Sequence, residues 1–136
     1  MKAAGTFTVK SFVPADLAAE PAVTTATPVG AATMEKLFAG EVSGHSTTLF
    51  TAALDQAAGA GTYLAMESFE GFLNGDSGTF NFAHSATTTG NDRTAELFVI
   101  VPTSGTGDLA GIHGTGGITI DEDGTHNIWF DYDLGR

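Results

Sequence analysis

The sequence predicts an all-β protein of one domain, either a β-sandwich or a closed β-barrel. Apolar residues recur with a period of two along most of the chain, which is typical of strands. Turn residues separate these segments at even spacing, as in sandwiches and barrels. No amphipathic pattern extends beyond one or two helical turns. A length of 136 residues fits a single domain, residues 1–136, with one core.

Each element follows from a local pattern. Residues 5–12 alternate, with Phe7 and Val9 on one face. Residues 14–28 are rich in Ala, Thr and Pro and predict a long connection, with one turn of helix at residues 16–19. The clearest hairpin surrounds Asn74-Gly75, the strongest two-residue hairpin signal. The predicted strands are residues 5–12, 33–40, 44–53, 62–73, 76–85, 93–102, 118–121 and 126–134.

Composition excludes several classes of protein. Five Lys and Arg residues stand against sixteen Asp and Glu, so the formal net charge is −11. Nucleic-acid binding needs a basic surface that five scattered cations do not supply. The absence of Cys excludes disulfide scaffolds and Cys-ligated zinc. The 42% content of hydrophobic residues argues against disorder.

The chain is expected to be cytoplasmic, with no membrane partner. Its first residues carry one cation, Lys2, and no apolar run long enough for a signal sequence. No segment approaches the ~18 consecutive apolar residues of a membrane-spanning helix.

The hairpin register predicts which side chains face the interior. A two-residue turn at Asn74-Gly75 pairs Leu73 with Asp76, and alternation then places one set of side chains on a single face. That face carries four aromatic residues, while the opposite face is mostly small or polar, so the aromatic face is the better interior. The same alternation, continued across the next turn, places Leu97, Val99 and Val101 beside it. The predicted pairs are Gly71 with Gly78, Phe69 with Phe80, Glu67 with Phe82, Ala65 with His84, and Tyr63 with Ala86.

Two ionisable side chains lie on this aromatic face. Glu67 and His84 are diagonal neighbours across the hairpin, within mutual reach. Burial raises the pKa of a carboxyl group, whereas a nearby imidazolium lowers it, and together these effects can produce a general acid or base near neutrality. Aromatic walls with a few polar groups are also typical of a small-ligand site. The alternative is structural, because a buried Glu-His pair can simply fix the register of two strands.

Other motifs give weaker indications. Residues 121–124 (Asp-Glu-Asp-Gly) lack the ligand spacing of a calcium loop, and the four histidines lack metal-type spacing, so no metal is expected. The Gly105-Thr106-Gly107 segment is a weak phosphate signal. It fits better as a turn that closes one end of the protein, with Leu109 and Ile112 as a plug. Tyr132 alternates with other apolar residues of its strand and is expected to point inward.

The chain resembles a bacterial family known as domain of unknown function 3224. The resemblance rests on residues 5–11, 38–44, 63–67, 75–80, 101–111 and 131–135, together with Gly71 and His84. It implies an eight-stranded antiparallel barrel of the allene-oxide-cyclase-like type, which plant dirigent proteins share. Proteins of those related groups hold apolar substrates in the barrel and guide cyclisation or coupling without metals or organic cofactors. They are commonly trimers or dimers.

Three hypotheses of function follow. The first is a cofactor-free isomerase or cyclase acting on a small apolar molecule, with Glu67 as acid, base or charge stabiliser and His84 as its partner. The second is a module that binds a small hydrophobic ligand without converting it. The third is a structural or assembly protein with a packed barrel. The doubly apolar strand at residues 97–101 predicts a homo-oligomer. The expected ligand-contacting residues are Tyr63, Phe69, Phe80, Phe82, Val99 and Tyr132.

Overall fold

The protein is described by a computed structural model covering residues 1–136. It consists of eight strands and one short 3₁₀ helix, η1 (Gly107–Leu109). That helix is much too short to cross a membrane, and no other helix is present. The strands are β1 (Lys2–Ala15), β2 (Val29–Gly40), β3 (Val42–Asp55), β4 (Ala60–Leu73), β5 (Asp76–Thr89), β6 (Thr94–Ile100), β7 (His113–Ile120) and β8 (His126–Asp133).

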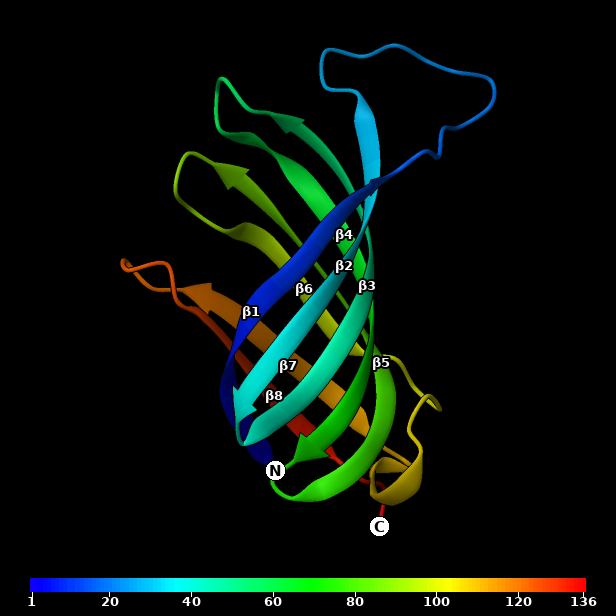
Figure 1. Ribbon diagram of the computed structural model, residues 1–136, viewed down its shortest axis with the longest axis vertical. Helices are drawn as coiled ribbons and strands as arrows, with labels where there is room; N and C mark the ends of the chain where they lie inside the picture. The colour runs from blue at the N-terminus through cyan, green and yellow to red at the C-terminus, as the bar shows by residue number, and fades with distance from the viewer.

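All eight strands belong to one antiparallel sheet that closes on itself. Each strand pairs with the next in the chain, and β8 pairs with β1 to complete a closed barrel. Both termini, the tight β4–β5 turn and η1 lie at one end, while the long β1–β2 connection extends from the other (Figure 1). We call these the closed end and the open end. The expected all-β class and its eight antiparallel strands are confirmed.

The β4–β5 hairpin has the register that its turn predicts. Leu73 pairs with Asp76, Glu67 with Phe82 and Ala65 with His84. Both strands continue beyond the predicted arms, because backbone pairing extends through small and polar residues as far as Ala60 and Thr89. Phe69, Phe80 and Phe82 are buried, so the aromatic face of this hairpin is the inward one, as predicted.

The turn of helix expected at residues 16–19 does not form. This segment belongs to the irregular connection between β1 and β2, and Leu17 is 73% exposed. One turn of helix is not stable without tertiary packing, and the exposed Leu17 side chain supplies none. The prediction of a helical turn was wrong for these reasons.

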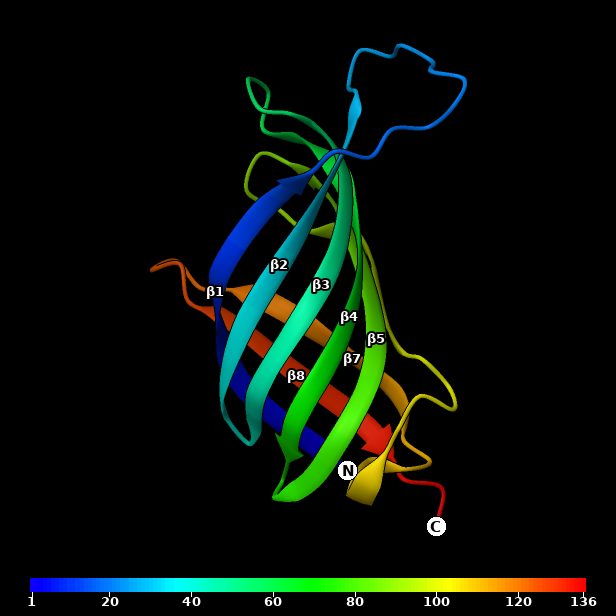
Figure 2. The same ribbon diagram turned by 45° about the vertical axis from the view of Figure 1, so that its right-hand side comes forward.

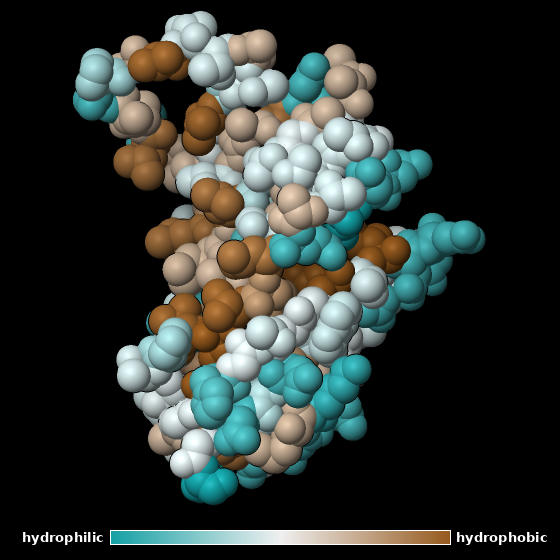
Figure 3. Space-filling view, turned by 180° about the vertical axis from the view of Figure 1, so that it is seen from behind, coloured by the Kyte–Doolittle hydropathy of each residue, from teal (hydrophilic) through white to brown (hydrophobic).

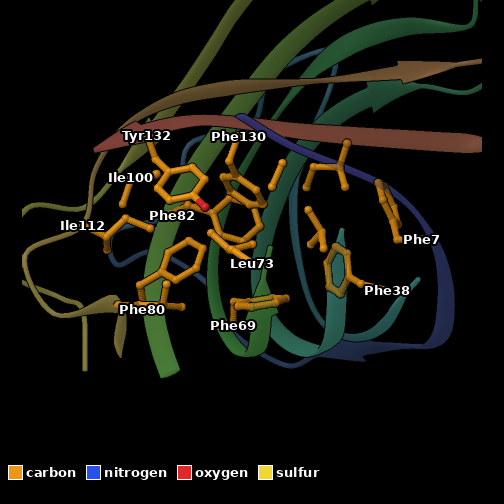
Figure 4. Close-up of a cluster of buried hydrophobic side chains, with 14 of the residues drawn as sticks. Phe7, Phe38, Phe69, Leu73, Phe80, Phe82, Ile100, Ile112, Phe130 and Tyr132 are labelled. Atoms are coloured by element: carbon orange, nitrogen blue, oxygen red, sulfur yellow. The ribbon is translucent and has the colours of Figure 1, made fainter. Parts of the chain in front are cut away.

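The core fills the closed end of the barrel. Aromatic and aliphatic side chains from all parts of the sheet meet there (Figure 4). Leu109 of η1 and the following Ile112 are buried and cover this end, as the plug prediction requires. Gly78 permits the cover to approach closely, because a Cβ atom there would lie 2.1 Å from the carbonyl oxygen of Thr106.

Strand β6 presents the opposite face from the one expected. Phe98 and Ile100 point inward, paired with His84 and Phe82, whereas Leu97 and Val99 are 51% and 38% exposed. The register shifts between Ser85 and Thr87, and Ala95 opposite this region has a φ of +50°. Such an irregularity reverses the alternation of every residue that follows it.

The strands separate between β6 and β7. Their only paired residues are Val99 and Thr115. Figure 2 shows β7 and β8 diverging from β4 and β5 toward the open end. Phe98 lies over Gly116, where a Cβ atom would be 2.7 Å from the phenyl ring. This aromatic ring therefore covers the weakly paired junction from inside.

Candidate functional site

Glu67 is the centre of a buried polar cluster at mid-height in the barrel. Its carboxylate is fully buried and receives hydrogen bonds from three strands. Lys36 Nζ on β2 lies 2.8 Å from Oε2, and Ser46 Oγ on β3 lies 2.8 Å from Oε1. His84 Nε2 on β5 also contacts Oε2. The alternation of each strand directs these side chains to the same interior point.

The cluster continues from His84 toward the open end. Tyr63 Oη lies 2.8 Å from His84 Nδ1, and an Arg93 terminal nitrogen donates to Tyr63 Oη over 3.0 Å. Arg93 Nε then donates to Glu96 at 2.8 Å, where the side chains reach solvent. A continuous hydrogen-bonded path, the polar chain, thus runs from buried Glu67 through His84, Tyr63 and Arg93 to the surface.

Between Arg93 and Glu67, every hydrogen bond of the polar chain is donated in the direction of Glu67. An ionised carboxylate can only accept, so His84 presents Nε2–H to it, and in the neutral ring Nδ1 then carries no proton. Nδ1 then accepts from the Tyr63 hydroxyl, which in turn accepts from Arg93. Every bond in the path is satisfied with His84 neutral and Glu67 ionised.

Electrostatics favour the same protonation states. Burial raises the pKa of the Glu67 carboxyl, but the His84 hydrogen bond and the Lys36 charge outweigh it and lower this pKa to about 2. Burial also lowers the pKa of His84, and the Glu67 contact reverses only part of this effect. Burial raises the pKa of Tyr63. The carboxyl group expected to have a pKa near neutrality therefore has one far below it, and the lowered pKa of His84 favours the neutral imidazole.

A small cavity, the inner cavity, lies on the open-end side of the cluster. Its volume is about 130 Å³. Glu67 does not line it, whereas His84 and Tyr63 do, so the polar chain forms its floor. The lining residues are Phe7, Val9, Met34, Lys36, Phe50, Tyr63, Ala65, His84, Arg93, Ile118, Ile120 and His126.

A wider depression, the outer cleft, adjoins the inner cavity. Its volume is about 1030 Å³, and it lies between the β5–β6 and β7–β8 loops. The two spaces are continuous, because five residues line both of them: Phe50, Tyr63, Arg93, Ile118 and Ile120. The outer cleft also carries four carboxylates, those of Asp92, Glu96, Asp121 and Glu122.

The structure brings together only part of the predicted site. Glu67, His84 and Tyr63 form one hydrogen-bonded group, with Phe82 stacked on His84 at 5.7 Å between ring centroids. Phe69, Phe80 and Phe82 are buried in the core and line neither the inner cavity nor the outer cleft.

Two predicted contacts lie elsewhere. Val99 points outward, because the β6 irregularity reverses its face, so its assignment to the interior was wrong. Tyr132 points inward as expected (Figure 4), but it belongs to the core, and its hydroxyl accepts a hydrogen bond from Asn74 at the β4–β5 turn. It lies at the closed end, away from the inner cavity.

Sequence reasoning missed Lys36, Ser46, Arg93 and His126. Lys36 shares the face of Phe38, and this alternation could have revealed a cation among inward-facing residues. Ser46 gives no such signal, since small polar residues are common on both faces of these strands. Arg93 was expected to begin a strand at residues 93–102, but β6 begins at Thr94, so alternation along the predicted strand did not give the direction of its side chain.

One buried polar atom in this region has no partner. The Thr48 hydroxyl is buried on β3, and Thr48 pairs with Glu67 across the β3–β4 ladder.

Asp121 and Asp123 at the acidic turn accept local hydrogen bonds, from the Asn127 side chain and the Thr125 amide respectively. These bonds fit the interpretation of residues 121–124 as a turn.

The fold and site together define a class: a closed β-sheet whose packed core ends in a buried ion pair beneath a small, mostly apolar cavity. Residues 3–132 match the family model described as "Protein of unknown function (DUF3224)", and the chain belongs to this family. A crystal structure of a DUF3224 protein of unknown function from Shewanella oneidensis MR-1 is similar, with 29% identity and a TM-score of 0.83. The match covers 98% of this chain and 96% of that one. No curated protein matches the chain.

Proposed function

We propose that the protein binds a small, mostly apolar molecule in the inner cavity, with His84 and Tyr63 at its floor. The observation that carries this proposal is the position of the polar chain. It meets the inner cavity through His84 and Tyr63, and apolar side chains form most of the remaining wall. Such a combination is typical of ligand sites, where a few polar groups orient a molecule held by apolar contacts.

The volume limits the ligand. About 130 Å³ is close to the ~150 Å³ of an engineered apolar cavity that binds benzene. A larger molecule can fit only by extending into the outer cleft. We therefore expect the buried part of the ligand to be about the size of one six-membered ring.

The alternative to ligand binding is a purely structural role for the buried polar cluster. A buried ion pair contributes little net stability, because the loss of hydration opposes the attraction between the charges. Lys36, Ser46 and His84 could still be retained because they fix the register of β2, β3 and β5 around Glu67. In that case the inner cavity would bind nothing.

A catalytic role is the second candidate, and the orientation of the polar chain favours it. A neutral imidazole supported by a carboxylate is a common form of general base. Glu67 would act as a charge stabiliser and positioning residue, and His84 with Tyr63 would face the substrate. Cofactor-free isomerisation or cyclisation fits these groups. It also fits the allene-oxide-cyclase-like and dirigent-like relationship, which we retain as a proposal.

Mass spectrometry of small molecules released from the purified protein tests binding. We expect a compound of ring size or slightly larger from the wild type. Ala65 is buried and lines the inner cavity, so Ala65→Leu should fill this space and remove the compound. Ala39→Leu on the exposed outer face of β2 is the matched control. Equal recovery from wild type and Ala65→Leu, or none from either, would argue against the proposal.

Glu67→Gln separates binding from catalysis once a ligand is known. If the protein is an enzyme, this variant should retain affinity but lose turnover, because the imidazole loses the charge that stabilises its protonated form. Unchanged turnover would exclude a catalytic role for the cluster. No turnover in the wild type would leave the binding module as the function.

We also propose a homo-oligomer, a dimer or trimer, formed through the outer face of β3 to β6. Exposed hydrophobic residues gather across the middle of one face of the molecule (Figure 3). On the sheet, Leu49, Met66, Ala83 and Val99 form one continuous outward row across four strands. Leu64 and Leu97 lie in the neighbouring row.

Cytoplasmic location stays a prediction that cell fractionation would test.

A further inference from the structure

The polar lining of the inner cavity has an unusual composition for this chain. Apart from Tyr63, its polar residues are Lys36, His84, Arg93 and His126, and no carboxylate lines it. The chain contains sixteen Asp and Glu but only five Lys and Arg. Two of the five cations and two of the four histidines therefore surround one small space from which every acidic side chain is absent.

These groups retain hydrogen-bond donors that the protein does not use. The Lys36 ammonium has three N–H groups; one bond goes to Glu67, and Nζ lies 4.7 Å from the centre of the Phe7 ring. Arg93 has five N–H groups and uses two, toward Glu96 and Tyr63. His126 makes no side-chain hydrogen bond and packs 5.0 Å from Phe7.

The pairing of Arg93 with Glu96 leaves the guanidinium free to change partners. Glu96 is 47% exposed, and ion pairs of this kind contribute little free energy. An acceptor entering from the inner cavity can therefore replace Glu96 at low cost. Lys36, in contrast, is held by the fully buried Glu67 and is fixed in place.

We propose that the ligand carries an oxygen acceptor, a ketone carbonyl or a carboxylate, and binds with this oxygen directed inward between Lys36 and Arg93. Its apolar body contacts Phe7, Phe50 and Ile118 and extends toward the outer cleft. This inference rests on the proposed binding function and adds the chemical class and orientation of the ligand.

The charges of the outer cleft support this orientation. Its four carboxylates lie on the side from which a ligand enters, whereas the inner cavity presents only donors and imidazoles. A cationic group is therefore held outside, and an acceptor oxygen gains partners only at the inner end. The positive charges also act within the inner cavity. Burial is the main cause that lowers the pKa of His126, and the charges of Lys36 and Arg93 lower it further.

Four phenyl compounds provide the test: benzene, acetophenone, benzoate and benzylammonium. Their dissociation constants are measured by NMR titration with the wild type, with the His84 ring signals identifying the site. We expect acetophenone or benzoate to bind about tenfold more tightly than benzene and benzylammonium, the ratio that one charge-assisted hydrogen bond readily supplies. The comparison of acetophenone with benzoate distinguishes a neutral carbonyl from a carboxylate.

Arg93→Gln and Arg136→Gln form a matched pair of variants. Each removes one positive charge, but Arg136 lies at the closed end, where it contacts the Asp108 carbonyl oxygen. We expect the preference for the oxygen compound to disappear in Arg93→Gln and to persist in Arg136→Gln. Equal affinity for all four compounds, or equal effects of the two variants, would overturn the oxygen-acceptor inference while leaving the binding function in place. Absence of any binding that shifts His84 would overturn both.

Discussion

Replacing Lys36 by Met should destabilise the protein strongly, because it leaves the Glu67 carboxylate buried without its cation. Lys36 is 4% exposed and Glu67 is 0% exposed. Removing one partner of such a pair typically costs ~3–5 kcal/mol. Ser46 and His84 still donate to the carboxylate, so we expect a loss of about 3 kcal/mol. That is a large fraction of the ~5–15 kcal/mol that stabilises a typical domain.

Equilibrium unfolding in urea measures this loss, with the fluorescence of the single tryptophan, Trp129, as the probe. The control is Lys10→Met, which removes an exposed ion pair with Glu35 and should cost at most ~1 kcal/mol. Adding Glu67→Gln to Lys36→Met removes the unpaired charge. We therefore expect the double variant to be more stable than Lys36→Met alone.

The penalty of Lys36→Met should also depend on pH. Without the ammonium, a proton on Glu67 or His84 can neutralise the buried charge, and protons bind more readily as the pH falls. The loss of stability should therefore be smaller at pH 5.5 than at pH 8. A loss no greater than that of Lys10→Met, or one that is the same at both pH values, would refute the buried-ion-pair reasoning.

Three further expectations follow from the structure. The wild type should lose stability as the pH falls below the unfolded histidine pKa of ~6.5, because the lowered pKa of His84 makes the unfolded state bind this proton first, and it should lose more toward pH 2 because the pKa of Glu67 is also lowered on folding. In urea titrations at a series of pH values, His84→Gln should reduce the loss of stability that begins near pH 6.5. Gly116→Ala should lower the free energy of unfolding by ~1–3 kcal/mol, because its Cβ atom would lie 2.1 Å from the Trp129 carbonyl oxygen and would also contact the Phe98 ring. Gly30→Ala, with open space around it, should be nearly neutral, and thermal unfolding measures both variants. Leu64→Glu should dissociate the oligomer in light scattering at micromolar concentration while Leu17→Glu in the β1–β2 connection should not; a monomeric wild type would contradict this proposal.

The sequence was most informative where the structure is local. A two-residue turn at Asn74-Gly75 determines the register of β4 and β5, so alternation alone predicted the contact of Glu67 with His84. Alternation gives the face of a residue but not its height in the barrel. Tyr132 was therefore placed on the correct face, yet it lies with Asn74 at the closed end.

The prediction failed where one residue alters the register or where partners come from distant strands. The irregularity opposite Ala95 reversed β6 and turned Val99 outward, and no composition signal marks such a shift in advance. The Glu67 pKa is lowered by the His84 hydrogen bond and also by the charge of Lys36, which is 31 residues away in sequence. The charge state of the cluster could thus be derived only once the pairing of β2 with β3 and of β3 with β4 had placed Lys36, Ser46 and Glu67 on one interior face.

The most direct test of the polar chain as the floor of a ligand site is the ¹H–¹⁵N spectrum of the histidine rings between pH 5 and 8. His84 should remain neutral to a lower pH than an ordinary histidine, because burial lowers its pKa, with its proton on Nε2 facing Glu67 and with Nδ1 accepting from Tyr63. Addition of acetophenone or benzoate should shift the His84 signals and leave those of the exposed His45 unchanged. A His84 ring that becomes charged at pH 6.5 or above, or that carries its proton on Nδ1, would contradict the account, as would a ligand response at His45 alone.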